Sequence, residues 1–297
     1  MRILAVMASG ARGGGAEHLL GLLPALRERG LDVQAWVGRD GPLLDELRGV
    51  DIESAAIELM HARMDPLAAV RLRRRVARAR VEEQVQLVHW HGTRAAFYGA
   101  VVPGPSVYTA HGLAFRKETT PHRRAVFLAA EAAACRATRV ISVSRTDRDE
   151  LVRRRFVRDE HAVHIGNAVR PERFSSLPDR EDARRALGLP VQGTLIGTTS
   201  RLVEQKGVDV TLRAMATWPE ARLVVAGDGP LRAELENLAQ TLNVKVTWLG
   251  RLDEVGAMLR ALDVFVLSSR WEGEPISLLE ALYCGLPCVA TATAGAK

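Results

Sequence analysis

The chain has 297 residues, of which 47% are hydrophobic and 26% are charged, and its formal net charge is +6. This composition is typical of a globular protein with room for two domains, and it excludes an intrinsically disordered chain. The longest apolar runs are only strand-sized, and the N-terminal run RILAVMAS is too short for a signal peptide, so we expect a cytoplasmic protein without a transmembrane helix.

Arginine supplies most of the positive charge, since only four of the 41 basic residues are lysines. Aromatic residues make up 5% of the chain, and no basic stretch is interleaved with them as single-strand binders require, so we predict no nucleic-acid partner. Three cysteines, Cys135, Cys284 and Cys288, lack the spacing of metal ligands and are predicted to be reduced structural thiols.

Strand-like and helical segments alternate along the first half of the chain, which predicts βαβ units around a parallel sheet. The strand-like runs are ILAVMA, DVQAWV, LVHWH, SVYTAH, RVISVS and AVHIG, and helices are expected over residues 16–29, 66–83, 122–136 and 146–155. Pro24 conflicts with the first helix, because a proline inside a helix removes a hydrogen bond and bends the axis. We nevertheless expect this helix to form.

A glycine-rich loop, residues 10–15, follows the first strand and opens the first helix. Backbone amides at such a helix N-terminus, here those of Gly14 and Gly15, attract phosphate. The glycine spacing differs from the dinucleotide-binding fingerprint, and the second strand ends at Val37 and Gly38 without an acidic residue. We therefore do not expect a nicotinamide-dependent dehydrogenase.

The helix expected over residues 66–83 carries the densest basic run, from Arg71 to Arg80, with apolar residues such as Leu72 and Val76 at helical spacing. Two interpretations stay open: an ordinary solvated helix face, or peripheral contact with an anionic membrane at its inner face. Vesicle co-sedimentation that depends on anionic lipid would separate them.

Histidines occupy the ends of two strands in the first half. His89 and His91 alternate on one strand, and His111 follows the next strand and precedes Gly112. Three histidines suggest a metal site, but no carboxylate or cysteine ligand accompanies them, so the favoured interpretation is polar residues that line a cleft, with no metal and no cofactor. His111 is the candidate for substrate contact.

The alternation lapses around residues 170–193 and then restarts, which predicts a domain boundary. We place the first domain at residues 1–175, a linker at 176–189 and the second domain at 190–297. The runs TLIGTTS, RLVVAG, KVTWLG, DVFVLSS and PCVATA alternate with helices over 208–216, 231–242 and 253–262 and with a helix after Pro275. The predicted fold class is α/β, with two Rossmann-like, doubly wound domains facing a cleft.

The loop after the first strand of the second domain contains Arg201 and Lys206 and leads into a helix. Two cations and a helix N-terminus beside one crevice are typical of a diphosphate site. No Walker sequence is present, so a nucleoside triphosphatase is not expected. The alternative is a surface loop with incidental charges.

The segment after DVFVLSS holds Glu272 and Glu280, which are eight residues apart. Pro275 suits the first helical turn, so Glu280 is expected about one and a half turns inside the helix, where both carboxylates can face one ligand. The alternative is an acid favoured by the helix dipole together with a solvated helix glutamate.

Taken in chain order, these segments resemble the family-4 retaining glycosyltransferases of the GT-B fold. The matching segments are RGGGAEHLLGLLPALRERG, VYTAHGLAF, VISVSRTDRDEL, HIGNAVRPERF, SRLVEQKGVDVTLRAMA, VVAGDGPLRAELE, VTWLGRLDEV and SSRWEGEPISLLEALYCGLPCVAT. The resemblance implies transfer of a sugar from a nucleotide-diphosphate-sugar donor to a lipid-linked or glycan acceptor in polysaccharide biosynthesis, with retention at the anomeric carbon.

The resemblance also implies roles for single residues. Arg201 and Lys206 would bind the donor diphosphate, and Glu280 would bind the ribose hydroxyls. Glu272 would contact the donor sugar, as would His111 from the other domain. These roles suit the chemistry, because fixed cations stabilise the charge that develops on a leaving diphosphate and carboxylates accept hydrogen bonds from hydroxyls.

The chain departs from the family pattern in two places. Relatives often have Asn-Gly-Val-Asp where this chain has residues 167–170, Asn-Ala-Val-Arg, and an apolar residue where Glu274 stands. Relatives also usually continue past ATATAGAK, so we expect a second domain that is incomplete at its C-terminus and unstable alone. The alternative functions are a nucleotide-sugar 2-epimerase of the same fold and a non-catalytic module that binds a nucleotide sugar.

Overall fold

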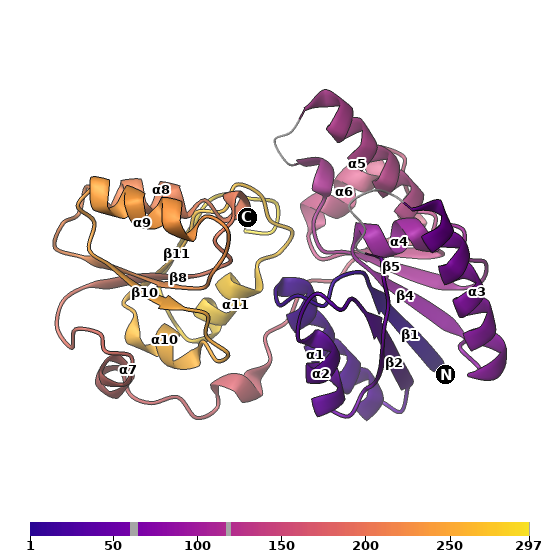
Figure 1. Ribbon diagram of the computed structural model, residues 1–297, viewed down its shortest axis with the longest axis horizontal. Helices are drawn as coiled ribbons and strands as arrows, with labels where there is room; N and C mark the ends of the chain where they lie inside the picture. Colours follow the sequence, from indigo (N-terminus) through magenta and orange to yellow (C-terminus); the bar gives the residue numbers. More distant parts are fainter. Residues whose placement is uncertain (60–64, 117–119, 297) are drawn as a thin grey trace. The chain divides into compact units, whose positions relative to one another are not determined.

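The computed structural model describes residues 1–59, 65–116 and 120–296. Internal contacts divide the chain into two compact units, residues 1–167 and 168–297 (Figure 1). The predicted linker at 176–189 contains helix α7 (Arg180–Ala186), which belongs to the second unit. The reason is packing, because Ala183 and Leu189 lie in the core of that unit.

The first unit is built on a parallel sheet of seven strands in the order β3-β2-β1-β4-β5-β6-β7. The strands are β1 (Arg2–Met7), β2 (Asp32–Val37), β3 (Glu53–Ala56), β4 (Leu87–His91), β5 (Ser106–Ala110), β6 (Arg139–Ser142) and β7 (Ala162–His164). The helices are α1 (Gly14–Glu28), α2 (Leu43–Gly49), α3 (Pro66–Glu82), α4 (Thr93–Gly99), α5 (Pro121–Ala134) and α6 (Arg145–Arg153), with short 3-10 turns at Ala114–Arg116 and Asp159–His161. Helix α1 continues through Pro24, as expected.

Strand β1 shows why the apolar runs form a sheet that is buried on both faces. Leu4 and Val6 join the core on one face. Ile3, Ala5 and Met7 join the core on the other face. Side chains alternate across a strand, so an unbroken apolar run packs against helices on both sides, as in other parallel sheets.

The second unit repeats this plan with five parallel strands in the order β10-β9-β8-β11-β12. The strands are β8 (Leu195–Thr199), β9 (Arg222–Ala226), β10 (Val246–Gly250), β11 (Val264–Leu267) and β12 (Cys288–Ala290). Its helices, besides α7, are α8 (Val208–Met215), α9 (Arg232–Thr241), α10 (Gly256–Ala261) and α11 (Ile276–Tyr283), with 3-10 turns at Pro171–Phe174 and Glu204–Lys206. Figure 1 shows α8 and α9 on one face of this sheet and α10 and α11 on the other. The predicted α/β class with two doubly wound sheets is confirmed.

Each sheet has a point where the strand order reverses direction. In the first unit it lies between β1 and β4, and in the second between β8 and β11. The loops that leave such a pair turn to opposite faces and open a crevice at the carboxyl ends of the strands, where α/β sheets bind ligands. The predicted glycine loop follows β1, and the loops with Lys206 and Glu272 follow β8 and β11, whereas His111 follows β5, the strand next to β4.

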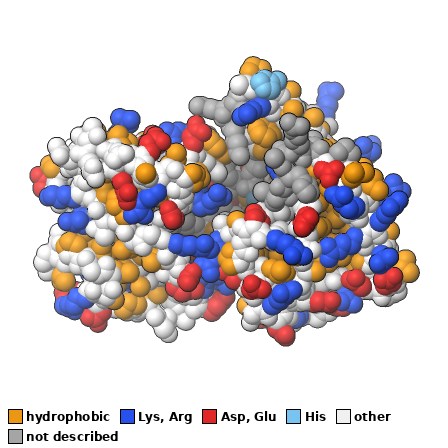
Figure 2. All heavy atoms as spheres, viewed as in Figure 1, with side chains coloured by type: hydrophobic (Ala, Val, Ile, Leu, Met, Phe, Trp, Pro, Cys, Tyr) orange, Lys and Arg blue, Asp and Glu red, His pale blue; other side chains and the backbone are white. Residues whose placement is uncertain are grey.

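The described helices include none that is long and apolar enough to cross a membrane. On the face shown in Figure 2, basic and acidic side chains are interspersed rather than gathered into one area of a single charge. All three cysteines are free thiols, as predicted.

Candidate functional site

In the second unit, the loop after β8 is fixed against the loop after β11. Gly207 has a left-handed backbone with φ 59°, and a Cβ there would lie 2.1 Å from the carbonyl oxygen of Ser268. The Ser268 hydroxyl donates to the Gly207 carbonyl at 2.6 Å. Arg270 donates to both carboxylate oxygens of Asp209, at 2.9 and 2.8 Å. These contacts hold the two loops of the crevice in one arrangement.

Lys206 and Glu272, predicted from separate loops, are in direct contact. The Lys206 Nζ lies 2.6 Å from Glu272 Oε1, and the two side chains are 20% and 8% exposed. Gln205 supports the pair, because its side-chain amide donates to the Trp271 carbonyl at 3.0 Å. A carboxylate this buried needs a charged partner, and Lys206 supplies it.

Glu280 lies in the second turn of α11 and is buried. Its Oε1 accepts a hydrogen bond from Nη1 of Arg173 at 3.1 Å, and Arg173 also contacts Glu254 Oε2 at 3.1 Å. The sequence analysis did not predict this ion pair, because Arg173 belongs to the 3-10 turn Pro171–Phe174 in the segment that follows the first unit. Arg201, at the start of the loop after β8, is exposed.

Buried polar atoms without a hydrogen-bond partner gather at the carboxyl ends of β8, β11 and β12. Within the described residues they are Thr199 Oγ1, Ser200 Oγ, Ser269 Oγ, Trp271 Nε1 and Thr293 Oγ1. Buried polar groups are nearly always paired in folded proteins, so such a concentration at one sheet edge makes this edge a candidate ligand site. The sequence reasoning missed these residues. Their signal was the hydroxyl-rich end of each strand, in TLIGTTS and DVFVLSS.

In the first unit, the glycine loop and His111 lie next to each other. A Cβ added to Gly15 would lie 4.0 Å from His111 Cδ2, while Gly14 faces open space. Burial, followed by the effect of His18, lowers the pKa of His111 to about 3. The ring is therefore neutral at pH 7 and can both donate and accept one hydrogen bond.

His18 joins this site, and the sequence analysis missed it. Its ring is 4.8 Å from that of His111 and 5.5 Å from that of His91. The His89 ring lies 4.0 Å from that of His91, but its Nε2 already pairs with Thr109 Oγ1 at 2.7 Å. The available signal was the position of His18 in the second turn of the helix that the glycine loop opens.

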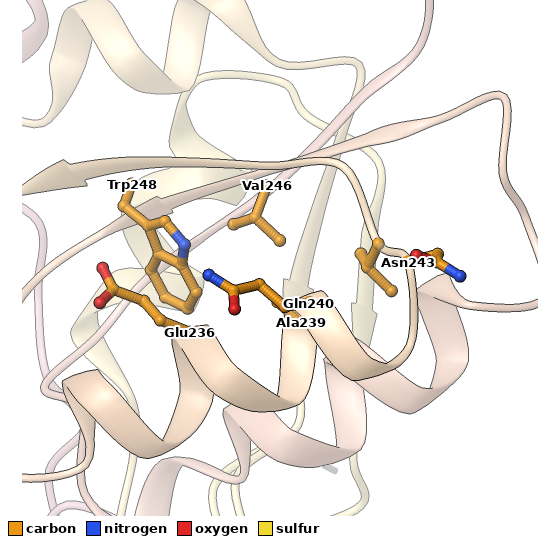
Figure 3. A pocket seen from close by; sticks show the side chains of 7 residues that line it. Glu236, Ala239, Gln240, Asn243, Val246 and Trp248 are labelled. Atoms are coloured by element: carbon orange, nitrogen blue, oxygen red, sulfur yellow. The ribbon is translucent and has the colours of Figure 1, made fainter.

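A further pocket of about 550 Å³ lies between α9 and the edge strand β10 (Figure 3). It is lined by Glu236, Ala239, Gln240, Asn243, Val244, Val246 and Trp248. Arg232 already stacks on the Trp248 ring at 4.8 Å. Because β10 is two strands away from β8, this pocket is separate from the crevice that contains Lys206 and Glu272.

Comparison with known protein families shows which family the chain belongs to. The model of the family described as Glycosyltransferase Family 4 matches residues 12–173, more than half of the chain. The chain belongs to glycosyltransferase family 4. A second model, described as Glycosyl transferases group 1, matches residues 179–297 of this family-4 chain, a range that includes Arg201, Lys206, Glu272 and Glu280.

Two curated relatives of this family-4 chain are named for their substrates. The chain is 29% identical to the UDP-Gal:alpha-D-GlcNAc-diphosphoundecaprenol alpha-1,3-galactosyltransferase of Escherichia coli over 225 residues, which cover 70% of this chain and 58% of the relative. It is 33% identical over 148 residues to a GDP-mannose-dependent monoacylated alpha-(1-6)-phosphatidylinositol monomannoside mannosyltransferase of Corynebacterium glutamicum, with 45% of this chain and 39% of the relative covered. The chain thus spans less than two thirds of the length of either relative.

A solved structure shares the fold. The Anabaena protein Alr3699/HepE, in complex with UDP and glucose, superposes with a TM-score of 0.84 at 23% sequence identity and covers 100% of this chain and 82% of its own. This similarity shows that the family-4 chain has the GT-B fold, with two Rossmann-like domains.

Proposed function

We propose that the protein transfers a sugar from a nucleoside-diphosphate-sugar donor to a lipid-linked or glycan acceptor, with retention at the anomeric carbon. One observation carries the proposal: Lys206 lies 2.6 Å from the buried carboxylate of Glu272 where the sheet order reverses, beside partnerless buried hydroxyls. Supporting it, the relatives are named for UDP-Gal and GDP-mannose, and the related Anabaena structure contains UDP and glucose.

The cations would act on the leaving diphosphate. When the bond between the anomeric carbon and the phosphate oxygen breaks, the nucleoside diphosphate takes the electron pair and its negative charge increases. Lys206 has three N–H donors, so it can hold Glu272 and a phosphate oxygen together. Arg201 and the amides at the start of α8 add further positive potential. No metal is required for this role.

The carboxylates would position the donor. We assign the sugar hydroxyls to Glu272 and the ribose hydroxyls to Glu280, because each carboxylate accepts hydrogen bonds from neighbouring hydroxyls. Arg173 is then a positioning residue, since its contact with Glu280 Oε1 orients that carboxylate. His111 would contact the sugar as a neutral ring, with Gly15 beside it leaving space for the ligand.

We propose that the acceptor hydroxyl attacks from the same face that the diphosphate leaves. The bond from the acceptor oxygen to the anomeric carbon forms, and the acceptor proton passes to the departing phosphate oxygen. Charge and protons balance without a protein base. Exclusion of water would keep hydrolysis from competing.

A donor panel tests the function. The protein is incubated with UDP-, GDP- and ADP-sugars, with and without a polyprenyl-diphosphate-linked sugar acceptor, and nucleoside diphosphate release is measured. We expect release from one donor that requires the acceptor and is lost in Glu272→Ala. The exposed Glu234→Ala in α9 serves as the control and should retain activity.

The same panel separates the alternatives. A new sugar product formed without any acceptor would indicate a nucleotide-sugar 2-epimerase. Saturable nucleotide binding without turnover would indicate a non-catalytic binding module. Absence of release from every donor would contradict the transferase proposal.

We further propose peripheral contact between the outer face of α3 and an anionic membrane. Leu67 is 65% and Val81 73% exposed on this helix, and Arg73 and Arg74 are exposed between them. Arg75 instead stacks on Trp36 at 4.0 Å, so it contributes to the fold. Exposed apolar side chains among arginines suit the boundary between headgroups and acyl chains.

Vesicle co-sedimentation measures this contact. Each arginine near an anionic surface contributes about 1 kcal/mol, so Arg73→Ala with Arg74→Ala should weaken binding to phosphatidylserine vesicles about 30-fold. The matched control, Arg213→Ala with Arg251→Ala, removes the same charge from exposed positions of the second unit and should bind as wild type. Equal binding to neutral and anionic vesicles would refute the contact.

A further inference from the structure

We propose that His18, His91 and His111 form a binding site for a divalent cation of the zinc type. One ring nitrogen of each lies within 4.8 Å of those of the other two. They come from helix α1, from the last position of β4 and from the residue after β5, three elements that meet where the order of the first sheet reverses. A small contraction brings the nitrogens to the ~3.4 Å spacing of tetrahedral zinc with three imidazole ligands.

The cluster contains nitrogens that the protein leaves without partners. His91 is 1% exposed, and both of its ring nitrogens are buried without a hydrogen bond. Nε2 of His111 is likewise buried and without a hydrogen-bond partner. A buried polar atom left unpaired is costly, and coordination to a cation would give these lone pairs a partner.

Asn167 orients His18 in the way that supporting residues orient metal ligands. His18 Nδ1 lies 3.0 Å from Asn167 Oδ1. An amide oxygen can only accept, so Nδ1 carries the proton and the lone pair of His18 is on Nε2. Metal-bound histidines usually donate their other N–H to such an oxygen. Asn167 is therefore a positioning residue of the site.

The ligand chemistry selects the class of cation. Imidazole nitrogens suit Zn²⁺, Co²⁺, Ni²⁺ and Cu²⁺, whereas Mg²⁺ and Ca²⁺ take oxygen ligands. Three histidines leave a fourth position open to water. Given the proposed function, a cation on His111 would occupy the ring that is proposed to contact the sugar, so this site would be inhibitory rather than catalytic.

Cobalt titration tests the site by binding, so its result is independent of transferase activity. Chelator-treated protein is titrated with Co²⁺ and followed by visible absorption. We expect one equivalent with the intense bands of tetrahedral cobalt, displaced by Zn²⁺. His18→Gln and His91→Gln should abolish it, and Asn167→Ala should weaken it by about 10-fold or more.

Two controls keep the test decisive. His122→Gln and His164→Gln remove exposed histidines outside the cluster and should bind as wild type. X-ray absorption of the zinc-loaded wild type needs no variant and should show three imidazoles at about 2.0–2.1 Å. A wild type without saturable binding, a folded His18→Gln that binds with unchanged affinity, or an all-oxygen shell would each overturn the proposal.

Discussion

Lys206→Ala is expected to lower kcat/KM for the donor sugar by roughly 100- to 1,000-fold, the usual cost of removing one preorganised group that stabilises transition-state charge. In the folded protein its ammonium lies 2.6 Å from Glu272 Oε1 at the loop that begins α8. The loss should appear in kcat as well as in KM, because charge on the leaving diphosphate is greatest in the transition state. Steady-state release of nucleoside diphosphate measures both constants.

The matched control for this prediction is Lys245→Ala. Lys245 is exposed, and its ammonium contacts the Pro219 carbonyl rather than a carboxylate. This variant should retain wild-type kinetics. Thermal unfolding of both variants separates catalysis from stability, since Glu272 loses a charged partner in Lys206→Ala. A folded Lys206→Ala protein with wild-type kcat/KM would exclude the assigned role.

Glu131→Gln is expected to stabilise the first unit above pH 7. Glu131 is completely buried in α5, where it accepts hydrogen bonds from the hydroxyls of Tyr108 at 2.6 Å and Thr93 at 2.9 Å. Burial raises the pKa of Glu131 from 4.5 to about 7, against the opposing effect of these hydrogen bonds. The folded state therefore retains a proton that the unfolded state releases near pH 4.5.

The sign of the pH dependence follows from this difference. The free energy of unfolding falls by about 3 kcal/mol as pH rises from about 4.5 to about 7, and it stays low above that pH. Asp147 adds to the trend, because burial raises its pKa to about 6 despite Arg116. Glutamine cannot ionise, so the difference in free energy of unfolding between Glu131→Gln and wild type should increase with rising pH.

Thermal unfolding of both proteins at pH 5 and pH 8 measures that difference. The variant should unfold close to wild type at pH 5 and several degrees higher at pH 8. The exposed Glu28→Gln on α1 should unfold as wild type at both values. A Glu131→Gln protein less stable than wild type at pH 8 would show that the ionised carboxylate stabilises this core.

Local sequence patterns were sufficient to predict the two sheets and the loops that carry charge. Apolar runs of strand length alternate with amphipathic segments, and each signal lies within about ten residues. Local patterns do not predict the strand order, because the order depends on which strands pair across the sheet. The contact of Lys206 with Glu272 requires β11 beside β8, an order that we did not predict from the sequence.

The residues that were missed depend on long-range packing. His18 lies near His91 only because β4 lies beside β1. The three histidines considered from strand positions therefore included His89 rather than His18. Arg173 reaches Glu280 across 107 positions of the sequence. Neither residue follows a strand end, where the sequence reasoning looked for ligand-binding side chains.

The most direct test of the account is calorimetric titration of UDP, GDP and ADP, each beside its monophosphate. We predict that one nucleoside diphosphate binds with saturation and at least about 10-fold more tightly than its monophosphate, because the second phosphate reaches Lys206, Arg201 and the start of α8. Equal affinity for the two, or no binding of any diphosphate, would contradict the assignment of this crevice as a nucleotide-sugar site.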